Sequence, residues 1–206
     1  MIRQFRADTA LLLIDVQQGV DVLFHWGGPK GRRNNPHAEA KMLALLAAWR
    51  QWKLPVVFTQ HDSREAASPL KLSEPGGRMK PGFEPGAGEI VVRKDVNSAF
   101  IGTDLEIQLR RHGIARLVHA GFFTNMCVET SVRMSGNLGF DTYLVHDACA
   151  TTNRRGLDGT DHEPEAVHAM TVANLHGEFC TALDTSAVIE LLGADAGQLS
   201  RAQGNE

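Results

Sequence analysis

Short apolar stretches alternate along this chain with segments of helical periodicity, and this alternation limits the fold more than any other feature. Leu11 to Ile14 is apolar without interruption, which is typical of a strand that is covered on both faces. Strands that alternate with helices are joined by right-handed parallel crossovers. We therefore expect one α/β domain over residues 1–206, a three-layer α/β/α sandwich with a mainly parallel six-stranded sheet. Its predicted strands span 9–16, 55–60, 90–93, 116–120, 141–145 and 180–183.

The first helix is predicted over 36–53. Asn35 is its expected cap, and Pro36 stands at its first position, where the missing N–H costs nothing. Its apolar residues at helical spacing are Met42, Leu43, Leu46 and Trp49.

Three further helices have their own start and stop signals. Thr103 and Glu106 form a capping box that opens a helix ending at Gly113. The segments 127–138 and 164–176 each end before a glycine, as helices commonly do.

Charge and length exclude several classes of function. The formal net charge is −3 and Lys and Arg are scattered, so no field would attract nucleic acid or an anionic membrane. No stretch approaches the ~20 apolar residues of a membrane span. A domain of 206 residues can bury a sufficient core without disulfides or metal. We expect a cytosolic protein whose partner is a small-molecule substrate.

The three cysteines are Cys127, Cys149 and Cys180. They are odd in number, far apart and without Cys-x-x-Cys spacing, which argues against a disulfide framework and against a zinc site. Any chemistry among them is therefore expected to be thiol chemistry.

The segment 68–88 departs from the regular pattern, because nine of its 21 residues are Gly or Pro. A loop of this length inside a domain is usually functional, here as a lid or as an arm that contacts a partner, although an unstructured surface insertion is the alternative. The polar tail at 193–206 is expected to fray.

Polar residues gather where the predicted strands end. Ligands of parallel sheets bind beyond the carboxyl ends of the strands. The residues expected at this edge are Asp15, His61, Asp62, Lys94, Cys127, His146 and Asp147.

An acid, an amine and a thiol at one edge suit acyl transfer. Cys127 lies near a helix start, where the helix dipole and the Lys94 ammonium would lower the pKa of its thiol. Asp15 could exchange protons, and N–H groups of the turn 123–127 could stabilise an oxyanion. Each of these residues alone often has an ordinary structural role: the aspartate as a turn residue, the lysine as a solvated surface charge and the cysteine as a buried apolar group.

Three stretches of the chain resemble the isochorismatase-like cysteine hydrolases, and the resemblance extends over 10–185. They are Leu-Leu-Leu-Ile-Asp-Val-Gln at 11–17, Val-Arg-Lys at 92–94 with Asn-Ser-Ala-Phe at 97–100, and Gly-Phe-Phe-Thr-Asn-Met-Cys-Val-Glu-Thr at 121–130.

The resemblance implies roles for particular residues. It places a catalytic triad at Asp15, Lys94 and Cys127, a cis peptide between Phe122 and Phe123, and an oxyanion hole at the N–H groups of Phe123 and Cys127. It also implies a homo-oligomer, either a dimer or a larger assembly.

A bound metal is not expected. The nicotinamidases of the same superfamily hold a metal through an Asp and several His after the second strand, whereas this chain has only His61 and Asp62 there. We therefore expect neither a metal nor another cofactor. His61 would line the pocket, hydrogen-bond the Asp62 carboxylate, or have a structural role.

The substrate pocket is expected to draw on loops and strand ends. The expected pocket residues are Gln17, Trp26, His61, Phe83, Phe100, Phe122 and Thr124. Cys149 would contact the pocket or be a buried thiol, and Cys180 would lie in the core. The spacing of His162, His168 and His176 favours a helix surface or an interface over a metal site.

These observations predict a hydrolase that cleaves an amide, carbamoyl or lactam C–N bond of a small molecule through a thioester on Cys127. Two alternatives stay open. One is cleavage of a vinyl ether, with Asp15 as the acid and Cys127 as a bystander. The other is a binding or assembly module without catalysis, because similarity of fold does not secure function.

Overall fold

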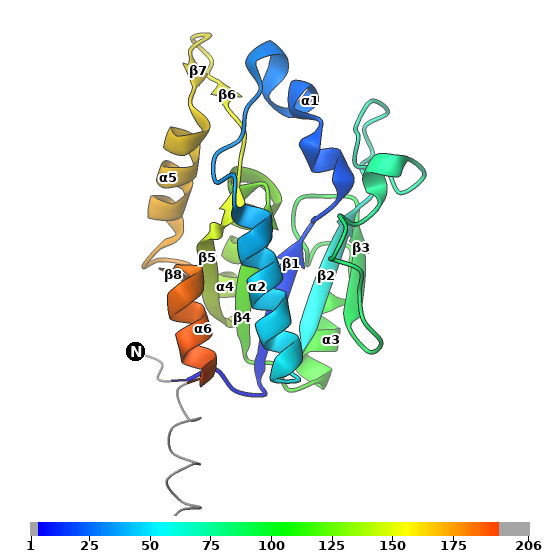
Figure 1. The fold of residues 1–206 in the computed structure, drawn as a ribbon, viewed down its shortest axis with the longest axis vertical. Helices are drawn as coiled ribbons and strands as arrows, with labels where there is room; N and C mark the ends of the chain where they lie inside the picture. The colour runs from blue at the N-terminus through cyan, green and yellow to red at the C-terminus, as the bar shows by residue number, and fades with distance from the viewer. Residues whose placement is uncertain (1–3, 194–206) are drawn as a thin grey trace, which may run out of the picture.

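Six parallel strands form the central sheet of the chain (Figure 1). The structure is a computed structural model and describes residues 4–193. The strand order is β3-β2-β1-β4-β5-β8, which confirms the predicted parallel sheet. The strands are β1 (Thr9–Ile14), β2 (Val56–His61), β3 (Ile90–Lys94), β4 (Arg116–Phe122), β5 (Asp141–Ala150) and β8 (Thr181–Leu183).

Helices cover both faces of this sheet, as expected for a three-layer fold. One face packs against α2 (Ala38–Gln51) and α6 (Thr185–Gly193). The other packs against α3 (Leu105–Arg111), α4 (Glu129–Asn137) and α5 (Pro164–Leu175). Leu11 and Leu13 enter the first core, while Leu12 and Ile14 enter the second, because successive side chains of a strand point to opposite faces.

Short elements lie beyond the carboxyl ends of the strands, at the top of Figure 1. They are α1 (Leu23–Gly27), the 3-10 turns η1 (Gln18–Asp21), η2 (Gly28–Lys30) and η3 (Pro75–Gly77), and a hairpin of β6 (Arg154–Arg155) and β7 (Asp161–His162). This edge is therefore where loops can build a pocket above the sheet.

The start of α2 differs from the prediction. The helix begins at Ala38, and the Asn35 side chain donates hydrogen bonds to the carbonyls of His146 and Cys149 at 3.1 and 2.6 Å. Asn35 thus ties α2 to β5 instead of capping the helix. Leu43 is exposed, whereas Leu45 is buried.

Two other predicted boundaries are corrected by the structure. Strand β5 continues to Ala150, because a register shift opposite β4 lets Cys149 pair with Gly121. Of the predicted capping box, only half forms: the Thr103 hydroxyl accepts from the N–H of Leu105 at 3.4 Å, whereas Glu106 pairs with Arg110.

The Gly/Pro-rich segment 68–88 packs onto the domain. Leu70 and Phe83 are buried in the core, and Met79 bridges to Gln17. The polar tail predicted to fray lies, from residue 194, outside the described residues. Between residues 4 and 193, no helix is both long and apolar enough to cross a membrane.

Candidate active site

Asp15 follows β1 directly and is held in an uncommon backbone conformation. Its φ of +52° lies in the left-handed region, which costs a non-glycine residue free energy. Thr59 of β2, which stands opposite Ile14 in the parallel register, fixes it. The Thr59 hydroxyl accepts from the Asp15 N–H at 3.1 Å and donates to Asp15 Oδ1 at 2.5 Å. The carboxylate therefore has a defined direction.

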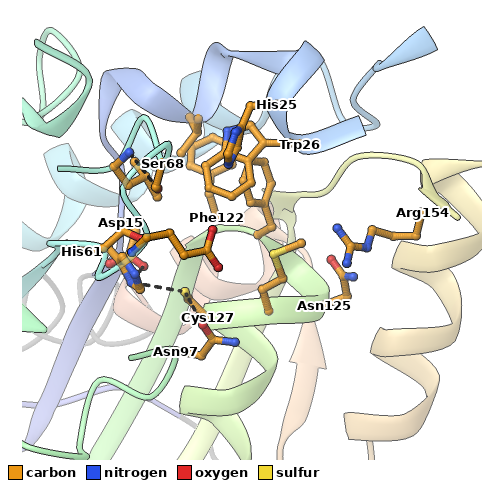
Figure 2. Close-up of a pocket in the computed structure, with 16 residues that line it drawn as sticks. Asp15, His25, Trp26, His61, Ser68, Asn97, Phe122, Asn125, Cys127 and Arg154 are labelled. Atoms are coloured by element: carbon orange, nitrogen blue, oxygen red, sulfur yellow. Dashed lines mark hydrogen bonds and ion pairs between the residues drawn. The ribbon is translucent and has the colours of Figure 1, made fainter. Parts of the chain in front are cut away.

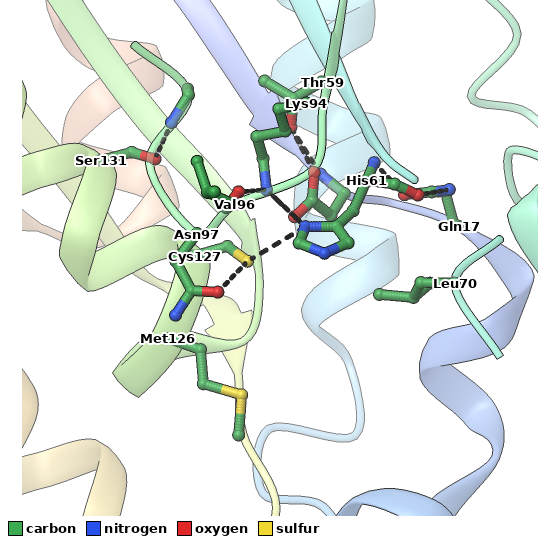
Figure 3. A network of polar contacts seen from close by, with 12 residues as sticks. Gln17, Thr59, His61, Leu70, Lys94, Val96, Asn97, Met126, Cys127 and Ser131 are labelled. Atoms are coloured by element: carbon green, nitrogen blue, oxygen red, sulfur yellow. Dashed lines mark hydrogen bonds and ion pairs between the residues drawn. The ribbon is translucent and has the colours of Figure 1, made fainter. Parts of the chain in front are cut away.

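Lys94, at the end of β3, donates all three of its ammonium protons to neighbouring groups in hydrogen bonds (Figure 3). Its Nζ donates to Asp15 Oδ2 at 2.6 Å, to His61 Nδ1 at 3.0 Å and to the Val96 carbonyl at 3.2 Å. Burial by itself would lower the pKa of Lys94, but the Asp15 carboxylate and the Cys127 sulfur together outweigh it and the pKa is raised. Lys94 thus stays charged beside Asp15.

Cys127 lies in a π-helical turn (Thr124–Val128, η4) between β4 and α4. Its Sγ is 3.9 Å from His61 Nδ1 and 3.8 Å from Asn97 Oδ1. Burial and then the nearby Asp15 carboxylate raise the pKa of the thiol, and they outweigh Lys94. The expectation of a lowered pKa is wrong, because the thiol is buried and lies close to the Asp15 carboxylate.

His61 is a neutral acceptor within this cluster. Burial and then the Lys94 charge lower the pKa of the imidazole. Gln17 holds its backbone: the Gln17 Oε1 accepts from the His61 N–H at 2.8 Å and the Gln17 amide donates to the His61 carbonyl at 3.0 Å. Gln17 therefore positions His61 from outside the cavity. The Asp62 carboxylate accepts from the N–H of Leu72 instead of pairing with His61.

The cluster of Asp15, His61 and Cys127 is better suited to the Lys94 ammonium group than to a metal ion. Asp15, His61 and Cys127 each place one ligand-type atom within 4.8 Å of the others. However, Lys94 Nζ already bonds Asp15 and His61, and a divalent cation there would be repelled by that positive charge. These residues therefore do not fit a metal centre.

A cavity of about 610 Å³ opens over this cluster (Figure 2). Asp15, His61 and Cys127 line its floor, and Ser68 from the Gly/Pro-rich segment reaches its wall. Its aromatic wall is formed by Trp26, Phe122 and Phe123. Its volume is typical of small-molecule sites.

The turn before Cys127 has the backbone that the resemblance implied. The peptide bond between Phe122 and Phe123 is cis. The N–H of Phe123 donates to no acceptor among residues 4–193. Trp26 packs on Phe123 with ring centroids 5.0 Å apart, and its indole N–H donates to the Gly19 carbonyl at 2.8 Å. The turn and the aromatic wall therefore support each other.

Thr124 faces away from the cavity. Its hydroxyl lies 2.9 Å from His168 Nδ1, and both residues are buried. His168 is thus not a surface residue, and burial together with the neighbouring His146 lowers its pKa to about 4. Thr124 and His168 therefore support the turn on the side that faces away from the cavity. His162 lies in β7 and His176 directly after α5.

Several other expected pocket residues lie elsewhere. Phe83 is buried in the core on the α2 face, and Phe100 stacks on Phe140 with ring centroids 6.1 Å apart. Neither lines the cavity. Cys149 is fully buried, and burial raises the pKa of its thiol to about 12. Cys180 is buried one residue before β8.

Further polar groups at the site escaped the sequence analysis. Asn97, Asn125 and Arg154 line the cavity, and Thr59 supports Asp15 beneath it. Asn97 and Asn125 lie within stretches that carried the family resemblance, so their positions beside Lys94 and Cys127 were an available signal. No sequence signal pointed to Arg154, because the hairpin that carries it is made of two-residue strands.

Comparison with known proteins identifies the family of the chain. The Isochorismatase domain model matches residues 9–185. The chain is 39% identical to the isochorismatase family protein YrdC of Bacillus subtilis over 180 residues, which cover 87% of this chain and 94% of YrdC. It is 32% identical over 109 residues to the ureidoacrylate amidohydrolase RutB of Methylobacterium radiotolerans, covering 53% of this chain and 38% of RutB.

The fold agrees as well. A solved isochorismatase-family structure from Chromobacterium violaceum superposes with a TM-score of 0.86 at 43% identity, covering 94% of this chain and 98% of that one. The domain match spans most of the chain, and YrdC is covered almost completely. The chain therefore belongs to the isochorismatase family of hydrolases.

Proposed function

We propose that this protein is a cysteine-dependent hydrolase that cleaves the C–N bond of a small amide, carbamoyl compound or lactam. One observation carries the proposal: Lys94 Nζ lies 2.6 Å from Asp15 Oδ2, and Cys127 Sγ lies within 4.8 Å of the Asp15 carboxylate, at the floor of a cavity. A thiol beside a fixed carboxylate is suited to nucleophilic attack on a carbonyl. The amidohydrolase activity in the name of RutB supports a C–N bond as the target.

In the first half-reaction, Cys127 Sγ bonds to the carbonyl carbon while its proton passes to Asp15. Because the pKa of the thiol is raised, proton transfer accompanies the attack instead of preceding it. The N–H groups of Phe123 and Cys127 stabilise the oxyanion. As the intermediate collapses, the C–N bond breaks and Asp15 gives its proton to the leaving nitrogen, which leaves a thioester on Cys127.

In the second half-reaction, water replaces the departed amine or ammonia. Asp15 takes a proton from the water as its oxygen bonds to the thioester carbon. The C–S bond then breaks, and the Cys127 thiolate regains a proton from Asp15. The net reaction adds one water across the C–N bond and restores the starting protonation states.

Lys94 and His61 support these steps without exchanging protons. Lys94 holds the Asp15 carboxylate and stays charged, since that carboxylate raises its pKa. With Nδ1 accepting from Lys94, the neutral His61 carries its proton on Nε2. As His61 lines the cavity, this N–H is available to a substrate acceptor.

The test compares Cys127→Ala, Asp15→Asn and wild type on a panel of small amides, carbamoyl compounds and lactams. We expect both variants to lose at least about 10³-fold in kcat/KM, because groups that act as a unit fail together. Intact-mass spectrometry of wild type should trap an acyl adduct on Cys127. Cys180→Ala, a buried cysteine away from the cavity, is the matched control and should keep its activity.

Full amide hydrolysis by Cys127→Ala would overturn the proposal. The same variant also separates C–N hydrolysis from cleavage of a vinyl ether. An ether cleavage that needs only Asp15 as the acid survives the loss of the thiol, whereas thioester chemistry does not.

A further inference from the structure

A second cavity, of about 510 Å³, adjoins the candidate active site. Trp26 and Arg154 line both cavities, so the two spaces meet at these side chains. The rest of the second cavity is lined by residues 27–30, at the end of α1 and in η2, by Asn153 and by the hairpin of β6 and β7. A substrate larger than a simple amide could therefore extend from Cys127 past Trp26.

The charge of this second cavity is opposite to that of the whole chain. Lys30, Arg154 and Arg155 line it, against the single carboxylate of Asp161. Asp161 Oδ1 already accepts a hydrogen bond from the Asn153 amide at 2.8 Å. Because the formal net charge of the chain is −3, this excess of cations is a local feature that favours an anionic ligand.

Arg154 is the cation at the junction, and it has no ion-pair partner within residues 4–193. The neighbouring Arg32 behaves differently, because its guanidinium binds the carboxylates of Glu163 and Glu165. Figure 2 shows Arg154 at one end of the cavity beside Asn125. An unpaired guanidinium keeps its planar set of donors, which matches carboxylate and phosphate oxygens.

We propose that the substrate carries an anionic group, a carboxylate or a phosphate, remote from the bond that is cleaved, and that Arg154 binds this group where the two cavities meet. The inference rests on the proposed function, because it places the reacting carbonyl at Cys127. It names a substrate class: small amides, carbamoyl compounds or lactams with a distal negative charge.

Equilibrium binding tests this with matched ligands in the Cys127→Ala background, which lacks the proposed nucleophile. The ligands are 4-carbamoylbenzoate, 4-carbamoylphenyl phosphate and the neutral benzamide, measured by calorimetry at low salt. We expect at least one anion to bind at least about tenfold tighter than benzamide. Adding Arg154→Ala should abolish that preference, and Arg154→Glu should reverse it.

The exposed Arg111, at the end of α3 and outside both cavities, provides the control. Arg111→Ala should keep the preference, which excludes an effect of net charge alone. Tighter binding of one anion only identifies that group as the one recognised. The proposal is overturned if neither anion binds tighter than benzamide, or if the preference survives Arg154→Ala. Whether hydrolysis requires Cys127 is measured separately. Hydrolysis that survives the loss of Cys127 would overturn the proposed function, not the assignment of Arg154.

Discussion

The Cys127 thiol illustrates how hydrogen-bond partners decide the effect of a nearby charge. The sequence places a lysine and a helix start close to this thiol, which favours a thiolate. In the structure the three Lys94 protons go to Asp15, His61 and the Val96 carbonyl. Burial and the Asp15 carboxylate then dominate, and the pKa of the thiol rises. The resting group is a neutral thiol close to the Asp15 carboxylate.

This arrangement predicts the pH dependence of alkylation at Cys127. In wild type, the rate with iodoacetamide should go on rising with pH above ~8.5, the pKa of a free thiol, because the raised pKa postpones thiolate formation. Asp15→Asn removes the negative charge that opposes the thiolate, so its inflection should move to lower pH while hydrolysis is lost. Peptide mapping of the adduct over pH 6–10 measures both profiles. A wild-type plateau at or below pH 8 would contradict this account.

The positions of the three residues proposed as a triad were predictable, whereas their supporting contacts were not. Asp15, Lys94 and Cys127 each lie at or beyond the carboxyl end of a strand in a parallel sheet, so topology alone brings them to one edge. Thr59 supports Asp15 only because β1 and β2 pair with Ile14 opposite Thr59. Strand register depends on packing of the whole sheet, which periodicity in one strand does not encode.

The contact between β1 and β4 next to Asp15 depends on the absence of a side chain. Gly121 of β4 pairs with Ile14 and has a φ of +135°. A Cβ at this position would lie 2.2 Å from the Ile14 carbonyl oxygen, much closer than atoms pack. The end of β1, and with it Asp15, can take its place only because residue 121 is glycine.

Gly121→Ala should therefore damage both stability and activity. The clash and the backbone strain together should lower the free energy of unfolding by about 3 kcal/mol or more. The folded fraction should also lose at least about tenfold in kcat, since Asp15 is displaced with Ile14. Urea denaturation and steady-state kinetics measure the two effects.

Gly139→Ala is the matched control. Gly139 also has a positive φ, of +80°, but a Cβ on this residue would meet no atom within 4 Å. The substitution should cost only about 1 kcal/mol and leave kcat unchanged. Equal loss of kcat in both variants would show that close packing against Ile14 does not position Asp15.

Strands were easier to predict than the segments between them. The continuous apolar run of β1 reflects burial on both faces, which is a local signal. The extension of β5 to Ala150 depends on a register shift against β4, and Phe83 enters the core because residues 68–88 fold back over the domain. Such contacts join residues far apart in sequence, and composition suggests only a loop there.

The folded molecule keeps an imidazole neutral in its interior, which links its stability to pH. His119 of β4 is fully buried, and its Nδ1 lies 3.1 Å from the Tyr143 carbonyl. Its Nε2 has no hydrogen-bond partner among residues 4–193. Burial lowers the pKa of His119 to about 4, against ~6.5 in an unfolded chain. Between these values the unfolded state binds the extra proton, so acid favours unfolding.

Replacement of His119 should flatten the acid side of the stability profile. The stability that depends on a neutral His119 is fully present above pH ~6.5 and is lost as pH falls towards about 4. At pH 5 the loss of unfolding free energy amounts to about 2 kcal/mol. His119→Asn retains a donor for the Tyr143 carbonyl but cannot titrate. Its loss of unfolding free energy between pH 7 and pH 5, measured by urea denaturation, should be smaller than that of wild type by about 2 kcal/mol. As a control, replacement of the exposed His112 by Asn should leave the wild-type loss unchanged. Equal losses in wild type and His119→Asn would assign the acid sensitivity to other groups. The buried His168 would then be the first residue to replace.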